Sequence, residues 1–448
     1  MSVALSSRGP LLASAGARLL MAAIAVLCLW GCVLWAYFAP PPPAVGELRA
    51  PPGPPGLHLV VASGQPAPSG GNFDRFDVAS QPIVAPVNAR GHVAFYASVL
   101  RSKTTEGIFL ATGNRVVKLV GIGDLVPGGG KLSEFASHPV PALNDSDKVA
   151  FGAAVAGARA TEGVFLASEG TLKAIALSGN DAPGVSTGTF AEFDAPTINN
   201  WDEVAFVATV RRGRETFQAL YLYSGGKLRK LVTQGDRTPR GGTFDKFGVP
   251  AINNKGVIAF PAVIEHGPVL GGIFVAGTRD LRMLLGVGEL GPNGTMLVRF
   301  SERIIINDED NVALSAELRS NNTTKEAVLV ITSSGPVEIA TVGDSAPGGG
   351  TFSGFGPWPS LGPGGMVAFI AGVDGGPGPL GLYAGQSPDL RRVAMVGEHL
   401  ADGKVLPGFA LNPVTSAGPN GGMTFATMAE PGTGQNGIYY FGPPSAAD

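Results

Sequence analysis

Short apolar runs alternate with turns rich in Gly, Pro and Asn along most of this chain. Residues 249–260 are typical and read Val-Pro-Ala-Ile-Asn-Asn-Lys-Gly-Val-Ile-Ala-Phe. Asn and Gly tolerate a positive φ, so this segment predicts two apolar strands joined by a hairpin turn. No long helical periodicity occurs after residue 56. The pattern therefore predicts an all-β protein in this part of the chain.

The same strand pattern recurs at an even spacing. A Val-Ala-Phe segment or a near variant occurs seven times, in steps of 54 to 56 residues. Such regular self-similarity is the sequence signature of a repeat architecture. The aromatic position of the seven copies is occupied by Phe95, Phe151, Phe206, Phe260, Leu314, Phe369 and Phe425.

Two turn positions accompany each copy. Seven residues before the aromatic position stand Asn88, Asn144, Asn199, Asn253 and Asn307, with Gly362 and Gly418 in the last two copies. Four residues before it stand Gly91, Asp147, Asp202, Gly256, Asp310, Gly365 and Gly421. Asp accepts a positive φ less readily than Gly, but both fit a tight turn. We therefore expect one hairpin of the same kind in every repeat.

The remainder of each repeat supplies two more strands and a loop. Residues 272–275 and 228–232 are examples of the third and fourth strands. The fourth strand leads to an acidic residue in five repeats, and a Pro- and Gly-rich loop then reaches an aromatic pair such as Phe244 and Phe247. Seven repeats of four strands predict a seven-bladed β-propeller with core-packing aromatic residues. An open β-solenoid is the alternative.

The two ends of the repeat region favour a closed ring. Residues 57–63 form a lone fourth strand before the first full repeat, and the last repeat ends after its third strand, at Tyr440. An N-terminal strand that completes the last blade would seal a ring and remove two exposed sheet edges. A solenoid gains nothing from this arrangement. The predicted propeller comprises residues 57–448.

The first 56 residues have a different character. Leu19 to Phe38 carry no charge, and twenty helical residues at ~1.5 Å each match a bilayer core of ~30 Å. Arg8 and Arg18 precede this run, which predicts a cytoplasmic N-terminus. We expect a cytoplasmic segment 1–18, a single transmembrane signal anchor 19–38 and a Pro-rich stalk 39–56. A cleaved signal peptide, or a lipoprotein modified at Cys32, are the alternatives.

The repeat residues resemble a bacterial tandem-repeat family described by a choice of anchor and an NxxGxxAF motif. The copies that begin at Asn88 and Asn253 match this motif in full, and the others keep part of it. The resemblance covers about residues 57–440. It implies attachment to a surface or membrane and no established activity. The turn-strand unit is also similar to TolB-type propeller repeats, which implies shared blade construction only.

Composition narrows the function further. The net charge is -3, so the basic excess of a nucleic-acid-binding protein is absent and no nucleic-acid partner is expected. Both cysteines, Cys28 and Cys32, lie in the apolar run, so disulfides do not stabilise the repeats. Five scattered His residues and no repeated catalytic motif predict neither a cofactor nor a catalytic residue.

Carboxylates are the remaining candidates for chemistry. Asp145, Asp147, Asp308 and Asp310 form two acidic turns that weakly resemble calcium loops, although solvated hairpin turns also explain them. A second acidic set follows the fourth strands, and its members are expected to cap backbone N–H groups at a loop. This set comprises Asp124, Asp236, Glu289, Asp344 and Glu398.

These features lead to one function hypothesis and two alternatives. We expect a propeller on the outer side of a bacterial cytoplasmic membrane, in the periplasm or outside the cell, that serves as a binding or scaffold module for a protein or glycan and has no assignable activity. The bilayer itself is the expected partner of Leu19 to Phe38. An enzyme acting on extracytoplasmic polysaccharide or peptide is one alternative, because catalytic residues from several blades can converge in space. A calcium-stabilised adhesin is the other.

Overall fold

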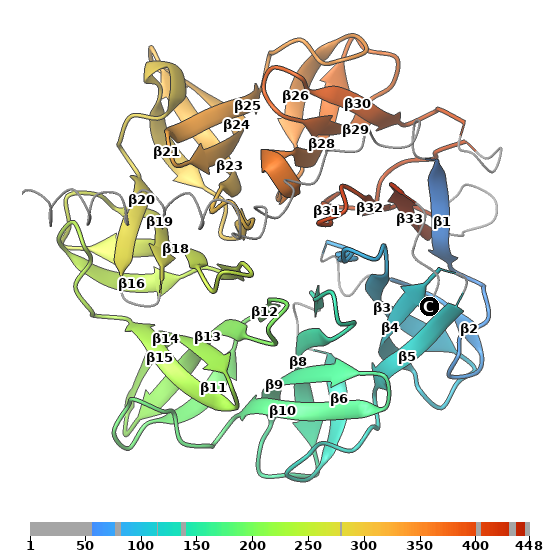
Figure 1. Cartoon of the computed structure of the whole chain (residues 1–448), viewed down its shortest axis with the longest axis vertical. Coiled ribbons are helices and arrows are strands. Elements are labelled where there is room, and N and C mark those ends of the chain that lie inside the picture. The colour runs from blue at the N-terminus through green and yellow to red at the C-terminus, as the bar shows by residue number, and fades with distance from the viewer. Residues whose placement is uncertain are drawn as a thin grey trace, which may run out of the picture. The chain divides into compact units, whose positions relative to one another are not determined.

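The repeats form a ring of seven β-sheets in the computed structural model of the chain (Figure 1). The structure describes residues 56–76, 82–113, 115–135, 140–277, 280–399, 405–429 and 436–443. The predicted anchor and residues 39–55 of the predicted stalk lie outside the described residues. Contacts divide the chain into residues 1–54 and a unit of residues 55–448, and only the second unit is described below. The all-β seven-bladed propeller is confirmed.

Each blade is a meander of antiparallel strands, ordered from the ring axis outward. Blade 1 contains β2 (Asn72–Phe73), β3 (Val93–Leu100), β4 (Glu106–Thr112) and β5 (Arg115–Gly121). Blade 2 contains β6 (Lys131–Phe135), β7 (Ala142–Leu143), β8 (Val149–Ala156), β9 (Glu162–Ser168) and β10 (Thr171–Leu177). Blade 3 contains β11 (Thr189–Phe193), β12 (Thr197–Ile198), β13 (Val204–Arg212), β14 (Glu215–Ser224) and β15 (Lys227–Thr233).

The remaining blades follow the same order. Blade 4 contains β16 (Thr243–Phe247), β17 (Ala251–Ile252), β18 (Ile258–Glu265), β19 (Gly271–Ala276) and β20 (Leu281–Gly286). Blade 5 contains the 3-10 helix η1 (Pro292–Gly294), β21 (Met296–Phe300), β22 (Ile305–Ile306), β23 (Val312–Ser320), β24 (Thr323–Thr332) and β25 (Gly335–Thr341). Blade 6 contains β26 (Thr351–Phe355), β27 (Ser360–Leu361), η2 (Pro363–Gly365), β28 (Val367–Asp374), β29 (Leu380–Gly385) and β30 (Arg391–Met395).

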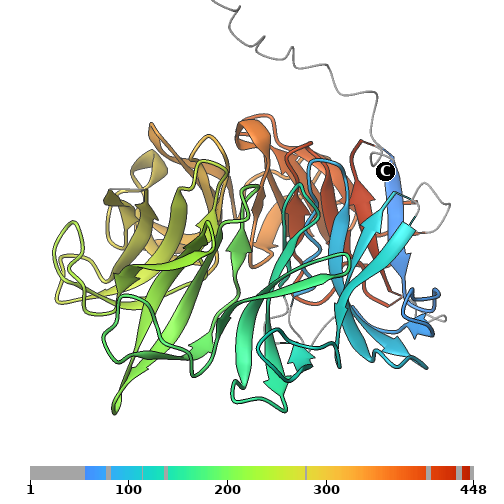
Figure 2. The same ribbon diagram turned by 60° about the horizontal axis from the view of Figure 1, so that its bottom comes forward.

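Blade 7 joins the two ends of the repeat region. It contains β31 (Thr415–Ala417), β32 (Met423–Ala426), β33 (Gly437–Phe441) and, as its outermost strand, β1 (Leu57–Ala62). β1 pairs antiparallel with β33 from Leu57↔Phe441 to Ala62↔Gly437. The two strands lie side by side in Figure 2 as well. The predicted closure by an N-terminal strand is therefore confirmed.

The inner strand of blades 2 to 6 differs from the prediction. It is divided into two short strands that pair with the two halves of one neighbour, as β16 and β17 do with β18. The first piece carries the aromatic pair that the sequence placed after a loop. The register shifts between Phe244 and Phe247, so the two rings escape strict alternation and both point into the core.

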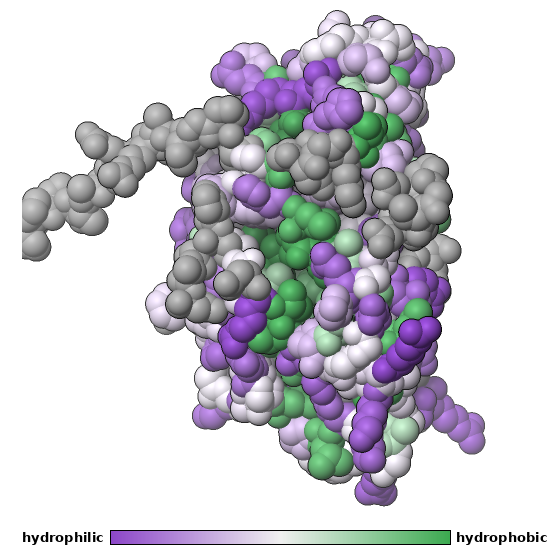
Figure 3. Space-filling view, turned by 90° about the vertical axis from the view of Figure 1, so that its right-hand side faces the viewer, coloured by the Kyte–Doolittle hydropathy of each residue, from purple (hydrophilic) through white to green (hydrophobic). Residues whose placement is uncertain are grey.

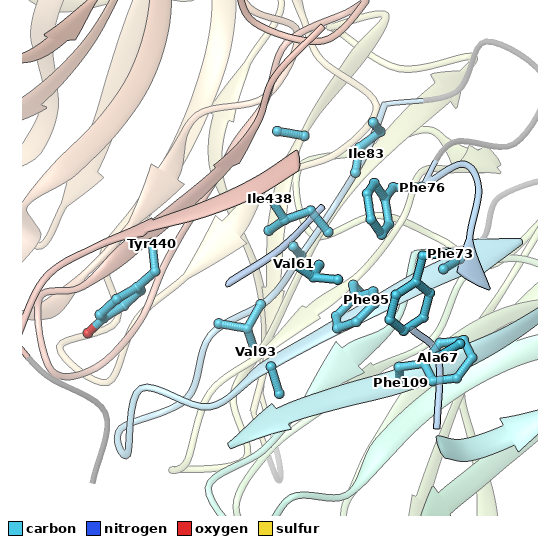
Figure 4. Close-up of a cluster of buried hydrophobic side chains, with 14 of the residues drawn as sticks. Val61, Ala67, Phe73, Phe76, Ile83, Val93, Phe95, Phe109, Ile438 and Tyr440 are labelled. Atoms are coloured by element: carbon cyan, nitrogen blue, oxygen red, sulfur yellow. The ribbon is translucent and has the colours of Figure 1, made fainter. Parts of the chain in front are cut away.

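Apolar clusters between neighbouring sheets form the core. The first and last blades share one cluster, in which Val61 of β1 and Ile438 of β33 pack with Phe73, Phe95 and Phe109 of blade 1 (Figure 4). Aromatic rings pack within the blades at centroid distances of 4.8–6.5 Å, which adds stabilisation beyond burial. The expected core role of the repeated Phe residues is thus confirmed.

The hairpin turns have the backbone that the sequence predicted. Gly91 and Gly256 lie at φ 76°, and Asp147, Asp202 and Asp310 take the same left-handed region at φ 59–64°. An Asp side chain tolerates this region, so the fold accepts it where the repeat would otherwise use Gly. The motif phenylalanines that follow these turns are all buried: Phe95, Phe151, Phe206, Phe260, Phe369 and Phe425.

The side of the ring that carries β1 in Figure 1 is shown in Figure 3. Apolar side chains gather in the middle of this side, among polar ones. Exposed apolar residues also occur on individual loops, including Leu125, Leu290 and Leu411. Single exposed apolar residues are common on folded proteins and by themselves indicate no binding site.

Candidate ligand-binding channel

A cavity of about 420 Å³ lies on the ring axis. Residues from all seven blades line it, including Pro86, Ala142, Thr197, Ile305 and Ser416. The innermost strands run in the same direction because every blade repeats the same meander. One end of the channel therefore collects the hairpin turns, and the other collects the residues that precede the short inner strands.

The turn end is built by the motif asparagines. Within its own turn, the Asn253 Oδ1 accepts hydrogen bonds from the N–H groups of Lys255 at 3.1 Å and Val257 at 2.9 Å. Its Nδ2 donates to the Asn307 carbonyl of the next blade at 2.9 Å and to Asp310 Oδ1 at 2.7 Å. The side chain therefore shapes one turn and fixes it to the next.

The same bridge recurs from blade to blade. Asn88 donates to the Asn144 carbonyl at 3.2 Å, and Asn144 donates to the Asn199 carbonyl at 3.1 Å. Asn199 donates to the Asn253 carbonyl at 3.0 Å, and Asn307 donates to the Gly362 carbonyl at 3.2 Å. We call this series the asparagine relay. It runs through blades 1 to 6 and ends where Gly362 and Gly418 replace the asparagine.

The residue after each relay asparagine forms a second series of bridges. Asp145 Oδ1 accepts from the Ala89 N–H at 2.7 Å, and Asn200 Oδ1 accepts from the Asp145 N–H at 2.9 Å. Asn254 donates from its N–H to Asp308 Oδ1 at 2.8 Å and from Nδ2 to Asp308 Oδ2 at 2.9 Å. The polar groups at this end of the channel are therefore bonded across blade junctions.

This geometry places all four calcium candidates in bridges between blades. Asp145 and Asp308 belong to the second series, and Asp147 and Asp310 accept from relay asparagines. Asp147 also accepts from the buried His92, whose Nδ1 lies 3.0 Å from Oδ1, and pairs with Arg90. No group of three His, Cys, Asp or Glu side chains suited to a metal ion occurs among the described residues. The calcium hypothesis stays a prediction that chelation must test.

The second acidic set caps loops as the sequence predicted. Asp124 Oδ2 accepts from the Gly121 N–H at 2.8 Å, and Asp236 Oδ2 accepts from the Thr233 N–H at 2.8 Å. The equivalent bonds of the other three members are 2.8–3.0 Å long. These carboxylates stabilise the turns that leave the fourth strands, and none of them lines the channel cavity.

The opposite end of the channel carries a cationic and an aromatic side chain. The Arg303 Cζ lies 5.2 Å from the ring centroid of Trp358, which is within cation–π range. Both residues line the cavity and are half-buried. Burial lowers the pKa of Arg303 to about 10, so the guanidinium still carries its charge at neutral pH. Among the described residues, no acidic side chain pairs with it.

Arg303 and Trp358 break the repeat at one position. Both stand four residues before the relay position, in neighbouring blades 5 and 6. The other five blades place small or medium apolar residues there, namely Val84, Val140, Ala195, Val249 and Val414. Sequence reasoning missed this pair because it compared the motif positions and not the strand that precedes them. Aligning the seven inner strands would have shown it.

A carboxyl group with a shifted pKa lies away from the channel. Burial, followed by the nearby charges of Glu192 and Asp194, raises the pKa of Glu162, which sits between blades 2 and 3. Its Oε1 is buried without a hydrogen-bond partner among the described residues. Glu162 does not line the cavity, so it does not supply the paired acidic groups at the channel mouth that an enzyme of this type would need.

These observations define a closed seven-bladed β-propeller with an axial channel. The chain belongs to the DUF7453 family, a family of unknown function, whose model matches residues 50–269 and 218–440. No curated protein matches the sequence. Membership agrees with the repeat architecture, whereas the choice-of-anchor family that the motif resembles stays a prediction.

Solved structures with a similar fold are distant in sequence. A Mycobacterium tuberculosis puromycin-hydrolyzing peptidase is 13% identical over 87% of this chain and 56% of its own, with a TM-score of 0.44. The polysaccharide lyase Uly1 is 11% identical, with coverage of 84% and 93% and a TM-score of 0.46. The Dos1 propeller is 8% identical, with coverage of 88% and 98% and a TM-score of 0.38. This chain thus spans about half of the peptidase, and we base no functional argument on these similarities.

Among the residues that the structure describes, no helix is long and apolar enough to cross a bilayer. Leu19 to Phe38 lie outside this part of the chain.

Proposed function

We propose that this protein is a ligand-binding module whose binding site is the axial channel. The observation that supports this is the cavity of about 420 Å³ lined by all seven blades. Pockets for small ligands usually measure ~300–1,000 Å³ and combine apolar walls with a few polar groups. A protein or glycan ligand would place a side chain, a terminus or a sugar unit in a cavity of this size.

The polar groups at the turn end favour binding over catalysis. Asp145, Asp308 and Glu309 are the carboxylates that line the cavity there, and the first two accept hydrogen bonds from the neighbouring blade. An acid and base pair would therefore have to include Asp145 or Asp308. A carboxylate that holds a blade junction together is poorly placed to exchange a proton with a substrate. An enzyme acting on polysaccharide or peptide is therefore the second hypothesis, and products released from a bound ligand would favour it.

The proposal includes the cellular location that the sequence predicts. Leu19 to Phe38 would anchor the chain in the cytoplasmic membrane, with the propeller in the periplasm or outside the cell. The charge-free run of twenty residues supports this part of the proposal. Two charges at the bilayer centre, as in a Val26→Arg, Leu27→Arg double variant, should release the chain from the membrane fraction, because each costs ~2.5–3.5 kcal/mol. Retention of that variant on membranes would contradict the anchor.

Binding is tested with the full chain and a panel of oligosaccharides and short peptides. Ser416→Phe adds a large side chain to a residue that lines the cavity. Ser334→Phe makes the same change at an exposed turn between β24 and β25 and serves as the control. Loss of binding only in Ser416→Phe supports a channel site. Equal binding by both variants and the wild type would refute it.

A further inference from the structure

We infer that the Arg303–Trp358 pair is a binding site for an oxyanion group, namely a carboxylate, sulfate or phosphate, on a small ligand that enters the channel. This inference rests on the proposed function, because it names the chemistry that the channel would select. It is carried by three observations: the cavity, the unpaired guanidinium that lines it, and the aromatic ring that holds this guanidinium.

The charge of Arg303 favours an anionic ligand. A guanidinium that is withdrawn from bulk water gains a counter-ion in most protein interiors, because an unpaired buried charge is costly. Arg303 has no such partner among the described residues, and burial lowers its pKa without removing its charge. A ligand anion would supply the missing partner. Arg binds two oxygens of a carboxylate, sulfate or phosphate group through two parallel N–H···O bonds, which a single ammonium group cannot do.

Contacts with the protein hold Arg303 in position. The backbone at Arg303 forms a parallel bridge with Val249 of the preceding blade, and its carbonyl accepts a hydrogen bond from Ser301 Oγ at 2.7 Å. Trp358 then covers one side of the guanidinium at 5.2 Å. Because both the backbone and the side chain are held before a ligand arrives, little conformational entropy is lost on binding. The arrangement suits a binding site better than a solvated surface charge.

The two ends of the channel carry opposite charges. Arg303 lies four residues before Asn307, which corresponds to ~13 Å of extended chain at ~3.3 Å per residue. The other end of the cavity carries Asp145, Asp308 and Glu309. An anionic ligand would therefore be attracted to one mouth and repelled from the other, so its acidic group should face Arg303.

The inference is tested by calorimetric titration of the full chain at low salt. The probes are glucuronate, sulfate and phosphate, with glucose as the neutral control and glucosamine as the cationic one. Arg303→Val introduces the residue that four other blades carry at this position, so we expect it to fold. Arg303→Lys keeps the charge but removes the planar fork, and it serves as the second variant.

We expect at least one oxyanion to bind and the neutral and cationic probes not to bind. Arg303→Val should weaken that binding by at least tenfold, Arg303→Lys by less, and added chloride should compete. Trp358→Phe should abolish the change in tryptophan fluorescence that accompanies binding. Whichever probe binds most tightly identifies the preferred oxyanion. Failure of every oxyanion to bind, or equal binding by Arg303→Val, would overturn the inference.

Two further results separate this inference from the proposed function. If neutral ligands bind and are lost in Ser416→Phe, while no oxyanion probe binds, the channel function holds and the oxyanion site is wrong. If an oxyanion binds through Arg303 but no oligosaccharide or peptide binds the wild type, the oxyanion site holds and the proposed protein- or glycan-binding function is wrong.

Discussion

The sharpest test of the architecture is removal of the closing strand. We consider an internal deletion of residues 57–62 in the full chain, which removes β1 and leaves the preceding residues in place. β33 then loses its outer partner, and the cluster shared by blades 7 and 1 loses Val61. The ring would have to stay shut through side-chain contacts at that one junction.

The structure allows the cost to be estimated. β1 and β33 are paired at five positions. At about 1 kcal/mol net for each backbone hydrogen bond, loss of the ladder costs ~5 kcal/mol. Loss of the fully buried Val61 side chain from the core cluster adds ~2 kcal/mol. The total of ~7 kcal/mol is a large part of the 5–15 kcal/mol that stabilises a typical domain. The deletion should therefore unfold the propeller or lower its melting temperature severely.

Thermal unfolding by circular dichroism and limited proteolysis provide the assay. Deletion of residues 45–50, which lie outside the described part of the chain, is the length-matched control. Val61→Ala gives a milder test and should cost ~1–2 kcal/mol, whereas Val337→Ala, at a residue that is 39% exposed, should cost under ~0.5 kcal/mol. If the deletion variant melts within about 2 °C of the wild type, β1 does not hold the ring closed.

Three smaller predictions concern single side chains. Glu162→Gln should stabilise the fold by about 1 kcal/mol near neutral pH, because burial raises the pKa of Glu162 and Gln218 already serves at this position in blade 3. Because the pKa of Glu162 is higher in the folded state than in the unfolded state, the wild type loses stability as the pH rises through that pKa. The stability gained by Glu162→Gln should therefore vanish near pH 4 in thermal melts recorded at several pH values. A gain that persists near pH 4 would contradict this account. Asn253→Asp keeps the acceptor oxygen but loses the Nδ2 donor, and the new carboxylate faces Asp310. The free energy of unfolding measured in urea should therefore fall by ~2–3 kcal/mol. An unchanged value would show that the asparagine relay does not stabilise the fold. Burial raises the pKa of Tyr221 to about 12, and its hydroxyl has no partner among the described residues, so Tyr221→Phe should match or exceed wild-type stability by up to ~1 kcal/mol.

The turn chemistry made the fold predictable from sequence. Asn253 and Gly256 define a local backbone that few residue types can adopt, and their recurrence at a fixed spacing reports one blade each. The closing strand could also be predicted, because the sequence shows a single fourth strand before the first repeat and a last repeat that lacks its fourth strand. Both inferences depend on local sequence alone.

The inner strands and the binding site were harder to predict for a physical reason. The bulge between Phe244 and Phe247 breaks the alternation of apolar and polar residues, so the segment resembles a loop. Arg303 and Trp358 are distant in sequence and meet only because neighbouring blades bring equivalent positions together. The bridging role of the relay asparagines likewise depends on a neighbouring blade, which the hairpin pattern of a single repeat does not contain.

The seven blades of the ring are not equivalent, and the asparagine relay, the closing strand and the Arg303–Trp358 pair all reflect this difference. The asparagine relay ends at Gly362 and is absent from Gly418, so the junctions on either side of blade 7 lack the bridge that holds blades 1 to 6 together. The junction of blades 7 and 1 is held instead by the β1 strand and by a hydrogen bond from Thr424 Oγ1 to the Ala85 carbonyl. Arg303 and Trp358 stand in blades 5 and 6, next to the point where the relay stops. On this side of the channel the repeat therefore changes both in the bridge between turns and at the residue four positions before it, and the two changes together place a cationic and an aromatic side chain where the other five blades carry apolar residues.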